Sequence, residues 1–333
     1  MSALGRLFSW GNAFEHPVTV GIVAAVSGVL VLAPLLILVV NKLARPEAKL
    51  KRELWLRYLS WVVLAPAIAL PILAGPGWTV VAVTALGLLC YAEFARATGL
   101  FREKLLSAIV VLGILAVNFA ALDNWYAFFV ALFPLCVGAI AVGTIFLDRP
   151  KGYIQRVALA LLGFTLFGAA LAHLSMFAHD ANYRPILLLL FFAVELNDIF
   201  AFCVGKPLGR HKLAPNTSPG KTVEGSIGAL ILTTMLTAVL GHFVFKGTAL
   251  DAWPLLILLG VTISVLGQLG DLTLSSIKRD LGIKDMASTI PGHGGVLDRF
   301  NSMLLVAPAV FHLANYVLPA VAHGQPQRVI TGG

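Results

Sequence analysis

Charged residues and cysteine are both scarce in this chain of 333 residues. Only 12% of the residues are Asp, Glu, Lys or Arg, whereas 59% are hydrophobic. Soluble domains carry about twice that share of charge, so this composition excludes an ordinary water-soluble globular protein. The three cysteines, Cys90, Cys136 and Cys203, lie in apolar stretches and lack CxxC spacing. They therefore predict neither a disulfide framework nor a zinc site.

Apolar runs of membrane-spanning length, in contrast, recur along the whole chain. A helix needs about 20 apolar residues to cross a bilayer. Ten runs approach or exceed this length, and the fold class that we expect is all-α, a polytopic integral membrane helix bundle of about ten transmembrane helices. The expected spans are residues 18–41, 57–74, 78–95, 104–122, 125–147, 156–178, 185–204, 226–245, 252–275 and 302–322.

The net charge of +8 is unevenly distributed between the loops. If the loops alternate between two sides, one side receives 20 of the 24 Lys and Arg residues. The positive-inside rule makes that side cytoplasmic and places both termini on the other side. We therefore expect an integral protein of a bacterial inner membrane, and a basic face of this origin gives no reason to expect nucleic acid as a partner. The basic segments are 42–57, 96–104, 148–156, 205–225 and 276–301.

One cytoplasmic segment, residues 275–301, is much more polar than its surroundings, with seven charged residues among 27. Charges at a membrane cost several kcal/mol unless they bind a partner. Asp271 lies just upstream, and Asp298 opens the last span. Two aspartates on neighbouring helices, with hydroxyl and amide oxygens nearby, suit Mg²⁺. Such aspartates, together with the surrounding Lys and Arg, are typical of sites for phosphoryl or nucleotidyl transfer.

Two upstream features face the same side of the membrane. Glu195 and Asp198 are three residues apart, hence on one helix face, near the cytoplasmic end of span 185–204. Ser218-Pro219-Gly220-Lys221-Thr222, just before a new helix, resembles a phosphate cradle built from hydroxyls, amides and a lysine. It is not a Walker A loop, because Pro215 stands where that motif needs glycine.

Residues 275–300 read S-x-I-K-R-x4-K-D-x-A-x2-I-P-x-H-G-G-V-x-D-R-F, which resembles the signature of the phosphatidate cytidylyltransferases, or CDP-diacylglycerol synthases. Asn197-Asp198 and the block Ser-Pro-Gly-Lys-Thr-Val-Glu-Gly at 218–225 are similar to a second block of that family. The resemblance covers about 195–302. It implies a Mg²⁺-dependent membrane enzyme, commonly a homodimer, that joins CTP to phosphatidic acid among the membrane lipids, giving CDP-diacylglycerol and pyrophosphate.

The resemblance also implies roles for single residues. The aspartates matching Asp271 and Asp298 hold the metal in the family, and cations such as Lys278 and Arg279 would face phosphates. These four are the catalytic residues that we expect. His293 lies between glycines, so it is a turn residue or phosphate donor rather than a base. The expected substrate-binding residues are Asp198, Ser218, Lys221, Thr222, Glu224, Ser275, Lys284, Asp285, His293, Arg299 and Asn301.

Two departures from the family pattern stand out: Asn301 where the family usually has aspartate, and Ala229 where it usually has a second glycine. Asn301 keeps an oxygen but loses a charge, which affects metal binding or the lipid accepted. Three alternatives therefore stay open. They are a CTP-using membrane enzyme or lipid kinase with another lipid acceptor, an inactive homologue that acts as a scaffold, and a transporter or channel with Asp198 or Asp271 as coupling site.

The character of the chain changes near residue 185, where polar residues enter the spans. We expect residues 1–184 to form an N-terminal transmembrane bundle. Residues 185–333 would form a C-terminal catalytic transmembrane region, with its cytoplasmic loops at 205–225 and 276–301.

Overall fold

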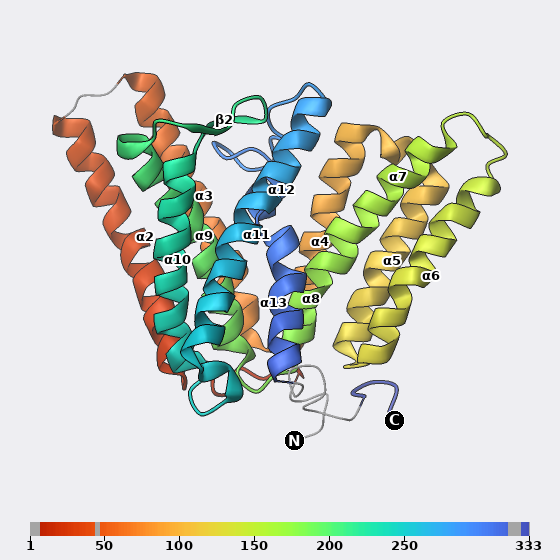
Figure 1. Ribbon diagram of the computed structural model, residues 1–333, viewed down its shortest axis with the longest axis horizontal. Coiled ribbons are helices and arrows are strands. Elements are labelled where there is room, and N and C mark those ends of the chain that lie inside the picture. The colour runs from red at the N-terminus through yellow and green to blue at the C-terminus, as the bar shows by residue number, and fades with distance from the viewer. Residues whose placement is uncertain (1–6, 44–46, 319–327, 333) are drawn as a thin grey trace.

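The computed structural model describes residues 7–43, 47–318 and 328–332, and most of the described chain is helical. This confirms a polytopic all-α membrane protein (Figure 1). The elements, in chain order, are α2 (Pro17–Leu43), α3 (Ala48–Ala74), α4 (Pro76–Thr98), η1 (Leu100–Arg102), α5 (Lys104–Leu122), α6 (Tyr126–Ile145), α7 (Tyr153–Gly163), the π-helical η2 (Phe164–Ala170), α8 (Leu171–Phe177), α9 (Tyr183–Leu208), β1 (Lys212–Ala214), β2 (Ser218–Thr222), α10 (Val223–Val244), η3 (Ala249–Asp251), α11 (Trp253–Asp280), α12 (Val296–Phe300) and α13 (Met303–Val317).

Nine helices in the described part of the chain are long and apolar enough to cross a membrane. The run from α7 through η2 to α8 counts as one of them, Tyr153–Phe177. These nine match the first nine expected spans. The tenth expected span, 302–322, is too long: α13 ends at Val317 and has 15 residues. Its expected end, 319–322, lies outside the described residues.

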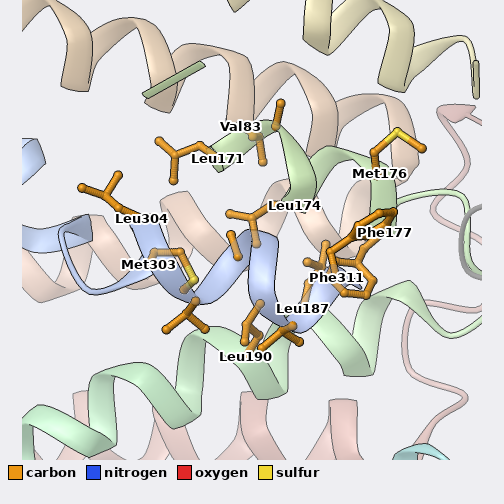
Figure 2. Close-up of a cluster of buried hydrophobic side chains, with 14 of the residues drawn as sticks. Val83, Leu171, Leu174, Met176, Phe177, Leu187, Leu190, Met303, Leu304 and Phe311 are labelled. Carbon is orange, nitrogen blue, oxygen red and sulfur yellow. The ribbon is translucent and has the colours of Figure 1, made fainter. Parts of the chain in front are cut away.

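The short helix α13 lies at the centre of the molecule. Figure 2 shows Met303, Leu304 and Phe311 of this helix surrounded by side chains of α8 and α9. Phe311 is fully buried, as are Leu174 of α8 and Leu187 of α9. Because lipid tails are as apolar as these side chains, close packing rather than escape from water holds α13 in place.

The outer helices have the opposite pattern, with large apolar side chains on their exposed faces. In α2, an 18-residue window with mean hydropathy 2.9 is only 6% buried. Such a surface is stable only when lipid covers it, since the backbone of a helix is already hydrogen-bonded internally. The outer helices therefore form the lipid-facing wall.

The polar segments gather at one edge of the bundle. Figure 1 shows the β1–β2 hairpin and the segment between α11 and α12 at the edge where α2 ends. The first residues of α2 and the last residues of α13 lie at the opposite edge. This matches the alternation of loops that the sequence predicts, whereas which edge faces the cytoplasm stays a prediction.

Helices α9 and α10 approach closely beneath this polar edge. A side chain at Gly225 would lie 2.6 Å from the carbonyl oxygen of Ala201, so only glycine fits there. Deeper in the bundle, the Asn197 side-chain oxygen accepts hydrogen bonds from Thr233 of α10 (3.0 Å) and Ser264 of α11 (2.6 Å). This buried polar contact holds α9, α10 and α11 in register below the site.

Candidate active site

Two lysine–aspartate ion pairs mark the polar edge. Lys221 of β2 places its Nζ 2.6 Å from Oδ2 of Asp271 on α11. Lys278, also on α11, places its Nζ 2.8 Å from Oδ1 of Asp298 on α12. Residues 271 and 278 are two helical turns apart on one face, so the two pairs are about 10 Å apart along α11. The fold thus brings four of the sequence-predicted site residues to one side of a single helix.

Asp298 is the more enclosed of the two aspartates, with 5% of its surface exposed. Its Oδ2 accepts hydrogen bonds from the backbone N–H groups of Met286 and Gly295, both at 2.9 Å. Its Oδ1 receives Lys278. Both oxygens are therefore engaged by protein donors, and Asp298 closes the segment between α11 and α12 onto the first turn of α12.

A second buried carboxylate, Glu93 of α4, caps the same helix and was not among the predicted site residues. Its oxygens accept hydrogen bonds from the backbone N–H groups of Val296 (2.9 Å) and Leu297 (2.8 Å), and from the Thr289 hydroxyl. Glu93 is the only acidic residue within the first six expected spans. A lone intramembrane carboxylate is a functional signal by default, and that signal could have identified Glu93.

The glycines before α12 make room for this arrangement. A Cβ on Gly295 would lie 2.3 Å from Oε2 of Glu93, so any side chain there would displace the carboxylate. On the other side, Ser60 of α3 donates a hydrogen bond of 2.7 Å to the Pro291 carbonyl. Trp61 of α3 meets the His293 ring edge-on. Helices α3 and α4 thus hold the turn at 291–295 from both sides.

His293 is half-buried in this turn rather than projecting as a free base. Burial, followed by the positive charges of Arg299 and Arg57, lowers the pKa of His293 below its ordinary value of 6.5. The ring is therefore neutral at neutral pH. This fits the turn or donor role that the sequence favours.

Asp271 has a second partner in Asn301, one of the two residues that depart from the family pattern. The Asn301 amide Nδ2 donates a hydrogen bond of 2.6 Å to Oδ1 of Asp271. Its Oδ1 accepts from the backbone N–H of Ser302, whose hydroxyl lies 3.5 Å from Asp198. Asp198 is exposed and within electrostatic reach of Asp271, Lys221 and Arg299. These residues link α9, α11 and the α12–α13 junction.

The predicted phosphate cradle at 218–222 has a different structure. These residues form strand β2, antiparallel to β1, with Lys212 opposite Thr222 and Ala214 opposite Ser218. An extended strand does not turn its successive N–H groups toward one point, so the segment is not an anion nest. The hairpin instead places Lys221 beside Asp271, with which it forms an ion pair. Ser218 is half-buried in the strand.

Thr222 and Glu224 hold this hairpin in place. The Thr222 hydroxyl caps α10 by accepting from the Gly225 N–H at 3.1 Å. Glu224 accepts from the backbone N–H groups of Arg210 and His211 and lies 2.7 Å from the His211 ring. Both side chains are thus engaged within the protein.

The remaining predicted residues surround these contacts. Arg279 is exposed and donates from its Nε to the Thr217 carbonyl at 3.2 Å, which ties α11 to the hairpin. Ser275 is buried on α11, whereas Lys284 and Asp285 are exposed. Arg299 is half-buried, and it forms no ion pair with any residue that the structure describes. A cation so placed is available to a ligand.

Comparison with known proteins shows the family of the chain. The sequence model of the cytidylyltransferase family matches residues 55–317, which include every site residue described above. The chain is similar to an uncharacterized protein of Escherichia coli strain K12, YnbB, with 31% identity over 278 residues, 81% of this chain and 90% of that protein.

Shorter alignments join the chain to proteins named phosphatidate cytidylyltransferase. The one from Staphylococcus haemolyticus is 39% identical over 155 residues, 46% of this chain and 55% of that protein. The one from Staphylococcus aureus strain COL is 42% identical over 137 residues, 40% of this chain and 51% of that protein. The chain thus spans about half the length of these two relatives. On the strength of the match over 55–317, this chain belongs to the cytidylyltransferase family.

Proposed function

We propose that this protein is a phosphatidate cytidylyltransferase, which transfers CMP from CTP to phosphatidic acid and yields CDP-diacylglycerol and pyrophosphate. The observation that carries the proposal is the meeting of Lys221–Asp271, Lys278–Asp298 and the unpaired Arg299 at one edge of a membrane bundle. A water-soluble nucleotide and a lipid phosphate can both reach such an edge. The names of the staphylococcal relatives support the same acceptor.

The chemistry needs charge neutralisation more than proton transfer. A phosphatidate oxygen attacks the α-phosphorus of CTP, the bond from that phosphorus to the bridging oxygen of the β-phosphate breaks, and pyrophosphate leaves with the electron pair. The attacking oxygen is already anionic at neutral pH, so no strong base is required. Lys221, Lys278 and Arg299 neutralise the phosphates and hold the reactants in line. His293, neutral in its turn, donates a hydrogen bond.

The residues present fit Mg²⁺, which would neutralise phosphate charge when bound. Mg²⁺ is usually held by one or two carboxylates, with waters and substrate phosphates completing its shell. Asp271 and exposed Asp198 offer such hard oxygens, and Asp271 would bind by giving up its contacts with Lys221 and Asn301. No cluster of three or more His, Cys, Asp or Glu in the described residues could hold a metal without that help. Asp298, the other predicted ligand, would bind only by giving up Lys278.

The decisive experiment incubates the purified protein with CTP, phosphatidic acid and Mg²⁺ and measures pyrophosphate and lipid product. We expect equal amounts of pyrophosphate and CDP-diacylglycerol. D271N keeps the shape but removes the charge, and we expect at least about a hundredfold loss of turnover, the size typical for one electrostatic group in a preorganised site. D280N, an exposed aspartate at the end of the same helix, is the matched control and should match the wild type.

The products separate this proposal from its rivals. Release of CDP together with a phosphorylated lipid would mean γ-phosphoryl transfer, and turnover with a different phosphorylated lipid alone would mean another acceptor. The proposal would be contradicted if the protein consumed no CTP with any of the phosphorylated lipids tested. The cytoplasmic orientation, the inner-membrane location and the homodimer belong to the same proposal.

A further inference from the structure

The carboxylate of Glu195 stands in the middle of the membrane-spanning helix α9 and has no role in the site described so far. Its side chain is half-buried, and it forms neither a hydrogen bond nor an ion pair with the residues that the structure describes. Ionisable side chains inside a membrane span are costly, and they are rare except where they serve a function. Glu195 therefore requires a positively charged group nearby.

Glu195 lies between two contacts that join α9 to the junction of α12 and α13. Phe191, Glu195 and Asp198 are spaced at i, i+4 and i+7, so they share one face of α9. On one side of Glu195, the Phe191 ring meets the Phe300 ring edge-on at 6.3 Å. On the other side, Asp198 lies 3.5 Å from the Ser302 hydroxyl. The Glu195 side chain consequently faces the same junction.

Arg299 is the only positively charged residue of this junction, residues 296–303. It lies three residues before Ser302, and the backbone stays helical through Asn301 and Ser302, so Arg299 and Ser302 share the side that faces α9. Glu195 and Asp198 are both within electrostatic reach of Arg299. Because the guanidinium forms no ion pair with any described residue, it is attracted by both carboxylates and bound by neither.

The two carboxylates differ in depth and in their other contacts. Asp198 is exposed and has the Ser302 hydroxyl beside it. Glu195 lies about 4.5 Å further from the polar edge along the axis of α9 and has no such contact. The described residues contain no group of three or more potential metal ligands that would account for Glu195 instead. The charge of Glu195 is thus left for Arg299 alone.

This depth decides which phosphate Arg299 reaches. A lipid acceptor approaches from within the bilayer, whereas a nucleotide approaches from the aqueous side. A carboxylate on the bilayer side attracts the guanidinium away from the aqueous side. Because arginine carries five N–H donors in a planar fork, a guanidinium oriented by one carboxylate still offers its other edge to a phosphate. Glu195 can therefore orient Arg299 without occupying it.

We propose that Glu195 is a positioning residue, which holds Arg299 toward the bilayer interior so that its guanidinium binds the phosphate of the lipid acceptor rather than those of CTP. Glu195 itself does not touch the substrate. The inference rests on the proposed function, because that function makes the acceptor a phosphorylated lipid.

The test measures the affinity of the purified full-length protein in detergent for phosphatidic acid and, separately, for CTP with Mg²⁺, by native mass spectrometry. We expect E195Q to weaken phosphatidic acid binding by at least about fivefold, as loss of a charged partner of arginine should, and to change CTP affinity by less than about twofold. E195D, which keeps the charge on a shorter side chain, should recover part of the loss. E103Q, at the residue before α5, is the control and should bind both ligands as the wild type does.

R299Q shows whether Glu195 acts through Arg299. If it does, E195Q causes no further loss of phosphatidic acid binding in an R299Q background, because the group that it positions is already gone. The proposal would be overturned by equal losses in both backgrounds, by wild-type affinity in E195Q or R299Q, or by a parallel loss of CTP affinity in E195Q. Failure of the proposed function gives a different result, in which these lipid-binding losses appear but the wild type forms no CDP-diacylglycerol when CTP is added. A wild type that binds no phosphatidic acid would overturn both.

Discussion

Asn301 is one of the two residues at which the sequence departs from its family, and its contact explains how this departure is tolerated. Its amide donates to Asp271, whereas an aspartate there would place a second carboxylate 2.6 Å from the first. Two such carboxylates repel unless a cation lies between them. Asn301 thus stabilises the site in the absence of a metal.

The N301D variant tests this account. Without divalent cations we expect a loss of about 1–3 kcal/mol in the free energy of unfolding, the usual cost of an uncompensated buried group. Mg²⁺ should restore much of it, because the added carboxylate then has a partner. Thermal unfolding in detergent with chelator and with Mg²⁺ measures both effects. N216D, in the exposed turn of the hairpin, should respond to neither condition, and an equal response of the two variants would contradict this role of Asn301.

His293 makes the stability of the turn at 291–295 depend on pH. Its pKa in the folded protein is lowered from 6.5, so the unfolded chain binds more protons below that pH. Stability is therefore full above about pH 6.5 and falls as the pH decreases through that value toward the lowered pKa. We expect H293Q to lose less stability than the wild type between pH 7 and pH 5 (an interval from about half a pH unit above the ordinary pKa to about 1.5 units below it). Unfolding curves with identical pH dependence would contradict the assignment.

At the scale of elements, α12 depends on carboxylates from two sources. With only five residues it makes few hydrogen bonds of its own. Asp298 from within α12 and Glu93 from α4 accept its first N–H groups and those of the preceding turn. Helix α4 is thus coupled to the signature segment, although it lies far from that segment in the sequence.

We expect E93Q to loosen this junction. Glutamine keeps one acceptor oxygen but turns an N–H₂ group toward backbone donors, at a cost of about 1–3 kcal/mol in stability. Hydrogen exchange at Val296 and Leu297 should accelerate, which mass spectrometry of the corresponding peptides measures. E103Q, at the residue before α5, serves as the control, because the Glu103 side chain makes no capping hydrogen bond in the part of the chain that the structure describes. Unchanged exchange in E93Q would mean that another group holds α12.

Sequence patterns predict elements formed by neighbouring residues better than they predict contacts between residues far apart in the chain. The spans follow directly from the length of apolar runs, and the Lys278–Asp271 spacing already places both residues on one face of a helix. The Glu93 contacts join residues 203 and 204 positions apart, which no local pattern reveals. The hairpin was missed because glycine, proline and hydroxyl residues suit a phosphate loop and a tight β-turn equally well.

At the scale of the whole molecule, the two edges of the bundle have different chemistry. The polar edge carries the ion pairs and the hairpin, whereas the opposite edge carries the first residues of α2 and the last residues of α13. The excess of Lys and Arg in the loops of the polar edge predicts that this edge faces the cytoplasm.

Cysteine labelling tests the orientation. On a C203A background, S288C marks the polar edge and K246C marks the opposite edge, and both positions are exposed. A maleimide that does not cross membranes should label K246C in intact cells and S288C only after the cells are permeabilised. The reverse pattern would invert the orientation and place the ion pairs outside the cell.

The shortness of α13 has a consequence for how reactants arrive. Fifteen residues span about 22 Å, roughly 8 Å less than the hydrocarbon thickness of a bilayer. Asn301 and its neighbours at the head of α13 consequently lie below the plane of the headgroups when the other end of the helix is at the far surface. A lipid can then enter by sideways diffusion within its leaflet, in two dimensions. Under the proposed function, a nucleotide would instead have to pass below the headgroup plane from solution to reach the same residues.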